Sequence, residues 1–187
     1  MLSNFDSAIL VTARLLEDSE RINVVISEVN TYSNSSNIIH DQIVHKHSSV
    51  TSIVIVDLSS LLLNVSKDLF RLQLVNYSGS RPLVIRSDIG VSIKNISTHS
   101  QVTIDSEVCV VLGKSFTTQG SLLMNSNLVK VGKHVVVHSE GTIEISANQI
   151  DATKGCLVAR DRVKLTVTKS IVHDTQNVEG NAVMHFG

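Results

Sequence analysis

The chain is poor in the residues that interrupt strands or supply large rings. Its 187 residues include no Trp, two Tyr, four Phe and a single Pro, at position 82. Long extended runs are therefore not broken by proline. Val, Ile and Leu supply most of the apolar surface, and Ser, Thr and Asn most of the polar surface. β-Branched side chains suit a pleated, half-buried surface, which favours strands.

Charge of one sign is also lacking. The formal net charge is −1, and neither a basic block nor an acidic tail occurs. This composition argues against nucleic acid or an acidic membrane surface as the main partner. Hydrophobic residues make up 42% of the chain, which argues against disorder and leaves room for one domain with a sizeable core.

Cysteine is scarce. Cys109 and Cys156 are too few to define a disulfide framework. A single bridge requires their Cα atoms to come within about 7 Å. The repeat described below places them on different strands of non-adjacent turns, so we expect two free thiols.

The chain shows neither a secretory signal nor a membrane span. Asp6 stands where a basic flank is needed, and Arg14 interrupts the first apolar run. No stretch approaches the roughly 18 uncharged apolar residues of a membrane helix. The sequence alone predicts an unsecreted chain without a span, or an extracellular one if it is a fragment of a longer protein.

Short alternating apolar pairs recur about every twenty residues from Pro82 onward. Members of a pair stand two residues apart, so they face the same side of a strand. First members are separated by 19, 20, 21 and 20 residues, and twenty more lead to Val183. The pairs are Leu83/Ile85, Val102/Ile104, Leu122/Met124, Ile143/Ile145 and Val163/Leu165.

Two further apolar series repeat at nearly the same interval. The second series is Ile89, Val108, Leu128, Ile150 and Ile171. The third series is Ile96, Phe116, Val136, Leu157 and Val178. Each unit of twenty residues is therefore predicted to contain three short strands, separated by polar corners.

Three strands and three corners in twenty residues match one coil of a right-handed parallel β-helix. Stacked coils lie about 4.8 Å apart, so equivalent side chains form columns inside. One coil cannot bury its apolar face alone, whereas a stack can. We predict an all-β solenoid of this kind. The rival, an antiparallel β-sandwich, favours hairpin turns, and the chain has no Asn-Gly or Asp-Gly.

The period is blurred upstream of Pro82. Counting back by twenty leads to the apolar residues Leu63 and Ile43, so we assign residues 38–187 to the solenoid and residues 1–37 to an N-terminal cap or irregular segment. Residues 7–17 favour a short helix that covers the edge of the first coil. The residues that suggest this helix are Ala8, Ile9, Leu10, Ala13 and Leu16.

Over Gly141–Val172, Ile/Val alternation, a polar corner and renewed alternation resemble right-handed β-helix surface proteins. Two groups are similar: the filamentous-haemagglutinin-like adhesins and the plant-type β-helix proteins of the cell surface. The resemblance extends over roughly Leu83–Val178 and implies a structural or adhesive role. It carries no catalytic residue to this chain. Those proteins usually have more Gly and a secretion signal, so the chain departs from them in features tied to extracellular placement.

Many parallel β-helices cleave acidic polysaccharides, so we searched for the carboxylates that such chemistry needs. The local candidates are Asp151, Arg160, Asp161, Arg162 and Lys164. These charges fall at corners, where solvation alone explains them, and aromatic platforms for sugar stacking are nearly absent. We assign no catalytic residue.

Two histidine pairs suggest a metal site. His45 and His47 share a strand face, and Asp41 is near them in sequence. His134 and His138 also share a face, but at about 13 Å they are too far apart for one ion. Without a third convincing ligand, we expect surface histidines and no metal or cofactor.

Other motifs add little. The chain has no Gly-x-Ser-x-Gly elbow, phosphate-binding loop or dinucleotide fingerprint. Glycosylation sequons occur at Asn34, Asn64, Asn76 and Asn95, which is close to chance for this composition. They matter only if the chain enters a secretory route.

We interpret the chain as a non-catalytic structural or interaction module that presents Ser, Thr, Asn and Lys to a partner protein or glycan. A polysaccharide-active lyase or hydrolase and a self-assembling cytosolic scaffold remain as alternatives. Asn181–Gly187 predict the first strand of a further coil. An open end of this kind favours end-to-end association or continuation of the solenoid.

Overall fold

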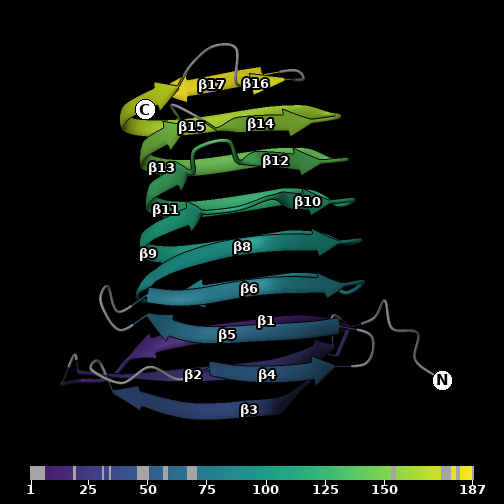
Figure 1. Cartoon of the computed structure of the whole chain (residues 1–187), viewed down its shortest axis with the longest axis vertical. Coiled ribbons are helices and arrows are strands. Elements are labelled where there is room, and N and C mark those ends of the chain that lie inside the picture. Colours follow the sequence, from purple (N-terminus) through teal and green to yellow (C-terminus); the bar gives the residue numbers. More distant parts are fainter. Residues whose placement is uncertain are drawn as a thin grey trace.

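The computed structural model of this chain is built from strands (Figure 1). It describes residues 7–18, 20–30, 32–33, 35–45, 51–56, 59–66, 71–152, 155–173, 178–179 and 182–186. Strands make up 77% of the structure, and the described residues contain no helix, membrane-spanning or otherwise. The predicted all-β solenoid is confirmed, with about five stacked parallel turns.

Seventeen strands follow one another along the described chain. They are β1 (Ser7–Leu15), β2 (Arg21–Asn30), β3 (Ser36–His45), β4 (Thr51–Val56), β5 (Ser59–Ser66), β6 (Arg71–Gly79), β7 (Leu83–Ser87), β8 (Gly90–Thr98), β9 (Val102–Leu112), β10 (Phe116–Thr118), β11 (Leu122–Val131), β12 (Val136–Ser139), β13 (Thr142–Ala152), β14 (Cys156–Ala159), β15 (Arg162–His173), β16 (Val178–Glu179) and β17 (Ala182–Phe186).

From β6 onward each coil contributes to three faces, which we name A, B and C. Face A contains β7, β17 and the segments 102–106, 122–126, 142–147 and 162–167. Face B contains the segments 71–75, 90–93, 110–112, 128–131, 149–152 and 170–173. Face C contains the segments 77–79 and 96–98 with β10, β12, β14 and β16.

The first apolar series forms one buried column on face A, as the period predicts. Successive members are register partners, and none is more than 1% exposed. The sixth place belongs to Ala182 and not to Val183, because Ala182 is the partner of Val163. The members of this column are Leu83, Val102, Leu122, Ile143 and Val163.

The second predicted series is only partly correct. Val108 is 49% exposed, and Leu128 pairs next to the column rather than in it. A bulge between Ser126 and Leu128 shifts the strand register at the corner between faces A and B. A series with a fixed period cannot predict that shift. The observed column is Val91, Val110, Val129, Ile150 and Ile171.

The third series is wrong at one position. Val136 is 48% exposed, and its neighbour Val137 pairs with Phe116. The corner before β12 is longer than the one before β10, so the repeat gains residues there. The observed column on face C is Ile96, Phe116, Val137, Leu157 and Val178.

Buried hydroxyl groups build the corner between faces C and A. The Thr118 hydroxyl donates to the Ser100 carbonyl of the preceding coil at 2.6 Å and accepts from the Gly120 N–H at 3.1 Å. In the next coil, Ser139 donates to the Gly120 carbonyl at 2.7 Å and accepts from the Gly141 N–H at 3.1 Å. Each hydroxyl therefore closes its own turn and fastens it to the coil beneath.

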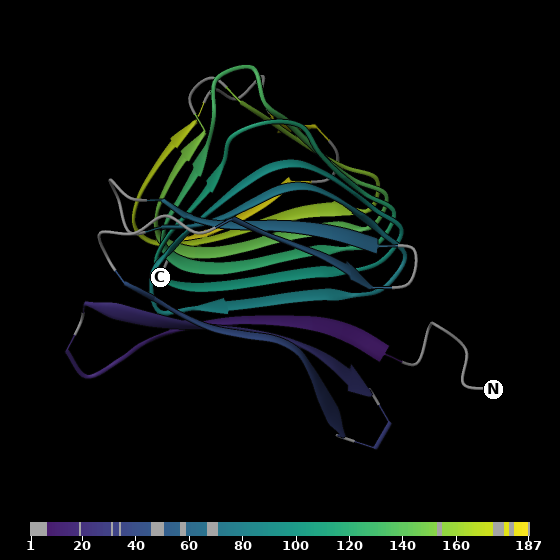
Figure 2. The ribbon, with the colours of Figure 1, turned by 60° about the horizontal axis from the view of Figure 1, so that its bottom comes forward.

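The N-terminal strands follow a different plan. β1, β2 and β3 pair antiparallel, and β1 joins β7 in parallel, with Ile9 opposite Leu83. These three strands thereby extend face A, and they project beyond the coils in Figure 2. The predicted helix over residues 7–17 is wrong. Ile9, Val11 and Ala13 alternate inward and are almost fully buried, and this burial outweighs helix propensity.

Antiparallel pairing also continues on the other side of the molecule. β4 pairs with β5 and β5 with β6, all antiparallel, and the parallel coils begin at β6. The parallel stacking therefore begins downstream of β5. The division into an N-terminal cap or irregular segment over residues 1–37 and a solenoid over residues 38–187 stays a prediction.

A buried ion pair ties the N-terminal strands to the coil. Arg81, in the turn before β7, donates to the carboxylate of Glu28 on β2. The Arg81 side chain is 5% exposed and that of Glu28 31%. Because Arg81 is buried, loss of its partner leaves a charge with little access to water.

The two cysteines are free, as expected. Cys109 lies on β9 and Cys156 on β14, so the predicted separation onto different strands is confirmed. The predicted strand in the C-terminal segment is present as β17, which pairs in parallel with β15.

Candidate ligand-binding groove

A groove of about 820 Å³ runs along the corner between faces A and B. It crosses strands from β1 to β15, so successive coils contribute to its wall. Its lining consists of Thr12, Ala13, Arg14, Arg86, Ser87, Asp88, Asp105, Ser106, Glu107, Asn125, Ser126, Asn127, Ser146, Ala147, Asn148 and Thr168.

Small inward-facing residues make this corner concave. Ser87, Ser106, Ser126 and Ala147 are register partners in successive coils, and each is less than a tenth exposed. Register shifts follow Ser126 and Ala147, as expected where a strand bends sharply. A larger side chain in this column has no room without pushing the corner outward.

The Ser106 hydroxyl in this column links two coils. It donates to the Ile89 carbonyl of the preceding coil at 2.8 Å and contacts the Cys109 carbonyl at 3.0 Å. It also accepts from the Val108 N–H at 3.3 Å. Buried hydrogen bonds therefore fix the floor of the groove at Ser106, which pre-organises the flanking side chains there.

One half of the groove presents only hydroxyl and amide groups. The Asn148 amide donates to the side-chain oxygen of Asn127 at 2.6 Å, and the Thr168 hydroxyl donates to the Asn148 oxygen at 2.5 Å. Asn125 and Ser146 are register partners on the facing side. This half offers rows of neutral donors and acceptors that repeat with the coil spacing of about 4.8 Å.

The other half is charged. Three carboxylates and two guanidinium groups line the wall near β1: Asp88, Asp105, Glu107, Arg14 and Arg86. The Asp88 carboxylate accepts from the Leu15 N–H at 2.9 Å. Within the described part of the chain, the other four side chains form no hydrogen bond or ion pair, although Arg86 and Asp105 are register partners. These charged groups remain available to a ligand.

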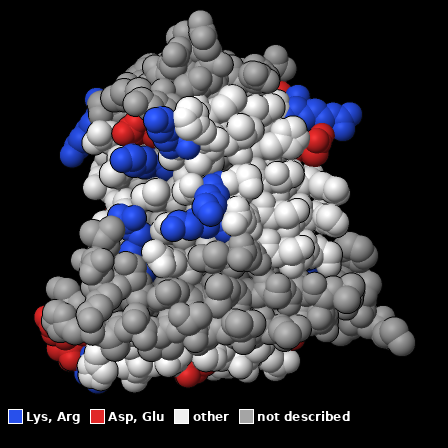
Figure 3. Space-filling model, in the orientation of Figure 1, with Lys and Arg blue, Asp and Glu red and all other residues white. Residues whose placement is uncertain are grey.

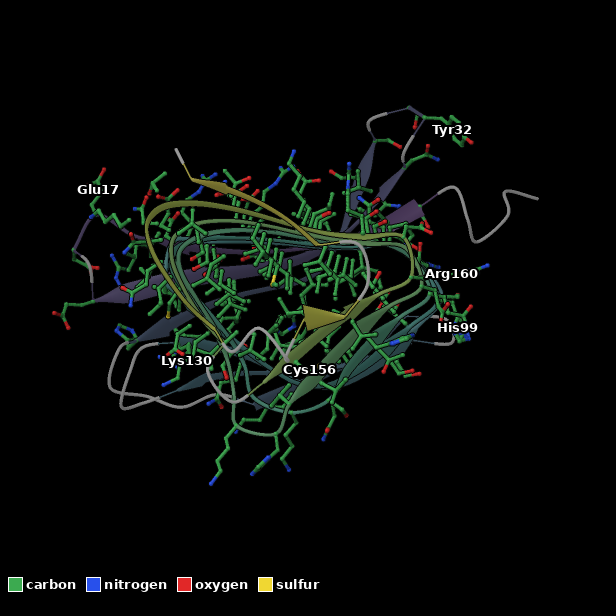
Figure 4. All side chains as sticks on the ribbon, turned by 90° about the horizontal axis from the view of Figure 1, so that it is seen from above. Glu17, Tyr32, His99, Lys130, Cys156 and Arg160 are labelled. Atoms are coloured by element: carbon green, nitrogen blue, oxygen red, sulfur yellow. The ribbon has the colours of Figure 1, made fainter. Side chains whose placement is uncertain are left out.

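The charged residues singled out from the sequence lie elsewhere. Asp151 is on face B, and Arg160 and Asp161 lie at the turn between faces C and A. Figure 4 shows Arg160 at the edge of the coil, pointing away from the core. Lys164 points outward from face A and pairs with Glu144 at 3.5 Å. None of these residues, nor Arg162, lines the groove.

The histidine candidates are dispersed as well. His134 lies before β12 in a left-handed turn with φ of 60°, so it does not share a strand face with His138. His138 donates to Glu140 at 2.7 Å, and this hydrogen bond lowers the pKa of the Glu140 carboxyl below its ordinary value. His45 ends β3, and His47 and Asn34 lie outside the described residues. Among the described residues, no group of three His, Cys, Asp or Glu is placed to hold a metal.

Sequence reasoning missed the groove, although a signal for it exists. Ser87, Ser106 and Ser126 recur at steps of 19 and 20, which is the same interval as the apolar columns. An inward small polar residue repeated in this way marks a corner, and the residues flanking it mark the rim. The apolar series lie on the faces of the coil, so a prediction from these series alone does not include the corners.

Comparison with known proteins does not add a relative. No protein-family model, curated protein or solved structure matches this chain.

Proposed function

We propose that the chain is a non-catalytic interaction module that binds a glycan chain in the groove between faces A and B. The observation that supports this most is the neutral half of the groove, where amides and hydroxyls repeat from coil to coil. A polymer of hydroxylated rings offers donors and acceptors at regular intervals to such rows. The stiff stack holds these groups in place before the ligand arrives, which lowers the entropic cost of binding.

The course of the groove favours a glycan over an extended peptide. Peptides commonly bind sheets by adding a strand to a free edge through main-chain hydrogen bonds. The groove crosses the strands, and β7, β9, β11 and β13 are each paired on both sides. Recognition there must come from side chains, and those of the neutral half are short polar ones.

The test is binding to a panel of soluble neutral oligosaccharides, measured by calorimetry. Replacing Asn148→Leu removes a central amide and fills the groove, so we expect at least tenfold weaker binding to any oligosaccharide that the wild type recognises. The exposed Ser97→Leu on face C is the matched control, with no expected effect. Absence of binding across the panel, or equal binding by both variants, contradicts the proposal.

The charged half of the groove supports a second candidate, a polysaccharide hydrolase. Asp105 and Glu107 stand two residues apart on β9, flank the inward Ser106, and both line the groove. Glycosidases commonly use a pair of carboxyl groups that flank the scissile bond. Asp88 adds a third carboxylate to the same wall.

Reducing-end release from neutral and acidic polysaccharides, with and without calcium, separates the two candidates. A hydrolase predicts turnover that falls at least a hundredfold in Asp105→Asn and in Glu107→Gln. A binding module predicts no turnover, and binding at the neutral half that survives both substitutions.

A further inference from the structure

A second polar surface lies at the corner between faces B and C. Three lysines lie in this corner, and a fourth lies at the adjoining end of face B. We name this surface the lysine ridge: Lys94, Lys114 and Lys133 in the corner, and Lys130 on face B. In Figure 3, Lys and Arg atoms gather toward the left of the face that carries β8, β10 and β12 in Figure 1, with Asp or Glu atoms beside the upper ones. Face B separates the ridge from the groove.

The lysine ridge concentrates positive charge in a chain that is nearly neutral. The sequence has nine lysines, and four of them belong to the ridge. The three corner segments involved, 94–95, 113–115 and 132–136, contain no Asp or Glu. Asp151, the register partner of Lys130, is the nearest carboxylate on face B. Within the described part of the chain, none of the four ammonium groups forms an ion pair or hydrogen bond.

The backbone arranges these lysines one coil above another. The corner of each coil begins at Lys94, Gly113 or Gly132, since Ile93, Leu112 and Val131 are register partners. The stem of Lys94 crosses Gly113, where an added Cβ would meet its Cγ at 3.3 Å. Glycine thus leaves the space through which the lysine reaches the next coil.

Repetition along the axis sets the spacing of the charges. Lys94, Lys114 and Lys133 come from three consecutive coils, so cationic groups recur at roughly 5 Å along a line. Lys114, Lys130 and Lys133 are exposed. In sequence, Lys154 follows Lys133 by 21 residues, and it lies outside the described residues.

We propose that the lysine ridge binds a linear polysaccharide that carries carboxylate or sulfate groups. A single line of cations on a rigid axis is complementary to a single line of anions on an extended chain. Each lysine adds a point charge and releases a counterion on binding, so affinity depends strongly on salt. This ligand differs from the neutral glycan proposed for the groove, and the two sites use no residue in common.

The composition of the ridge disfavours nucleic acid as its occupant. Single-stranded nucleic acid is usually held by aromatic side chains on which the bases stack, and the three corner segments contain no Phe, Tyr or Trp. Arginine, the preferred residue for bidentate phosphate recognition, is also absent from them. A flat anionic membrane needs a broad basic face, whereas the ridge is narrow.

The experiment measures binding of heparin and of polygalacturonate at several salt concentrations, with dextran as the neutral probe. We expect the wild type to bind both anionic chains and not dextran. The double variant Lys114→Gln/Lys133→Gln should bind at least tenfold more weakly at low salt. The slope of log affinity against log salt should fall by about two.

A variant of equal charge controls for net charge alone. Lys164→Gln/Lys169→Gln removes two lysines outside the ridge, and we expect its affinity to stay within twofold of wild type. Lys114→Arg/Lys133→Arg keeps the charge and should retain binding. All four positions are solvent-accessible, so circular dichroism should show an unchanged fold.

Three results would overturn the proposal. The first is absence of wild-type binding to either anionic polysaccharide at low salt. The second is an equal loss in the ridge variant and in the equal-charge control, which indicates non-specific attraction. The third is tighter binding of single-stranded poly(dT) than of either polysaccharide. The groove variant Asn148→Leu should leave heparin binding unchanged, so failure at one site is distinguishable from failure at the other.

Discussion

Face A joins the coils, at β7, to the N-terminal strands β1–β3, yet the two regions are built by opposite rules. In the coils, neighbouring strands are parallel and come from segments about twenty residues apart. In β1–β3, neighbouring strands are antiparallel and directly consecutive. The antiparallel strands β1–β3 therefore form without a sequence repeat. In this chain the sequence repeat is confined to the parallel strands of the coils.

The two regions also bury their residues differently. In the coils, equivalent side chains stack into columns, and the three faces together enclose the core that these columns fill. Figure 4 shows side chains filling this interior. In β1–β3, only one face is buried, and β3 carries the exposed residues Ile38 and Ile43. We therefore expect perturbations of the coil to be global and perturbations of β1–β3 to be local.

The largest effect is expected from a cavity in a column of the coil. Leu122 is fully buried between Val102 and Ile143. Leu122→Ala should lower the free energy of unfolding by about 3 kcal/mol. Val24→Ala, on β2, removes less volume from a region closed on one face only, and should cost about half as much. Urea denaturation measures both, and an equal cost would remove the distinction between the regions.

The next effect concerns the connection between the regions. Arg81→Ala removes a buried side chain together with its ion pair to Glu28, and should destabilise the docking of β1–β3 by about 2 kcal/mol. Hydrogen exchange should accelerate in residues 7–45 and remain slow in β9–β15. Arg21→Ala is the matched control, since Arg21 pairs with Asp18 at 2.7 Å on the surface. Uniform acceleration along the chain would mean that the two regions unfold together.

Glycines at coil corners test how tightly the coils stack. A Cβ on Gly120 would lie 2.5 Å from the Gln101 nitrogen of the preceding coil, whereas one on Gly113 would meet only the flexible Lys94 side chain, at 3.3 Å and beyond, and the Ile93 carbonyl at 3.6 Å. Gly120→Ala should cost about 2 kcal/mol, and Gly113→Ala less than about 0.5 kcal/mol. Thermal melts of the two variants provide the measurement. Similar melting temperatures would show that the coils separate easily.

A smaller effect is expected at the buried hydroxyls. Thr118→Val keeps the shape of the side chain but removes a donor to Ser100 and an acceptor for Gly120. The cost should be about 1 kcal/mol or slightly more. The neighbouring exposed Thr117→Val serves as control, and its stability should stay within about 0.5 kcal/mol of wild type. If Thr118→Val did not lower the stability, the corner would not depend on this hydroxyl.

The smallest effect is a pair of carboxyl titrations, one in each region. Hydrogen bonds from His138 and from Arg21 lower the pKa of Glu140 and of Asp18, respectively. A lowered pKa contributes stability that is present above the unfolded value, about 4.5 for Glu and 3.8 for Asp, and lost as pH falls through the folded value.

NMR titration should place both carboxyl pKa values below these ordinary values. His138→Ala should raise the pKa of Glu140 and leave that of Asp18 unchanged. A Glu140 pKa that does not respond to this substitution would contradict the hydrogen bond.

The sequence predicted the coil better than the corners or the N-terminal strands. Its strongest signal came from paired apolar residues such as Val102 and Ile104, because both members must face the core at a fixed spacing. Single apolar residues carried less information, and Val108 and Val136 were assigned inward although they are exposed. Corners of unequal length shift the register by one residue, and one residue reverses the face of a strand.

Residues 7–17 were misread because the argument there was local. Ala8, Leu10 and Leu16 are good helix formers, and no repeat was available to outweigh that preference. The pairing of β1 with β7 joins residues more than seventy positions apart, which no local pattern reveals. The groove was missed for a related reason, since it gathers residues from six strands.

Spin-label distances along face A test the stacked coil most directly. In a chain with Cys109 and Cys156 replaced, one label is placed at Val84 and the second at Thr103, Leu123, Glu144 or Lys164 in turn. These five outward positions are consecutive register partners. The distance should rise by about 5 Å per coil, to about 19 Å between Val84 and Lys164. Distances that do not increase in equal steps would contradict the parallel stack.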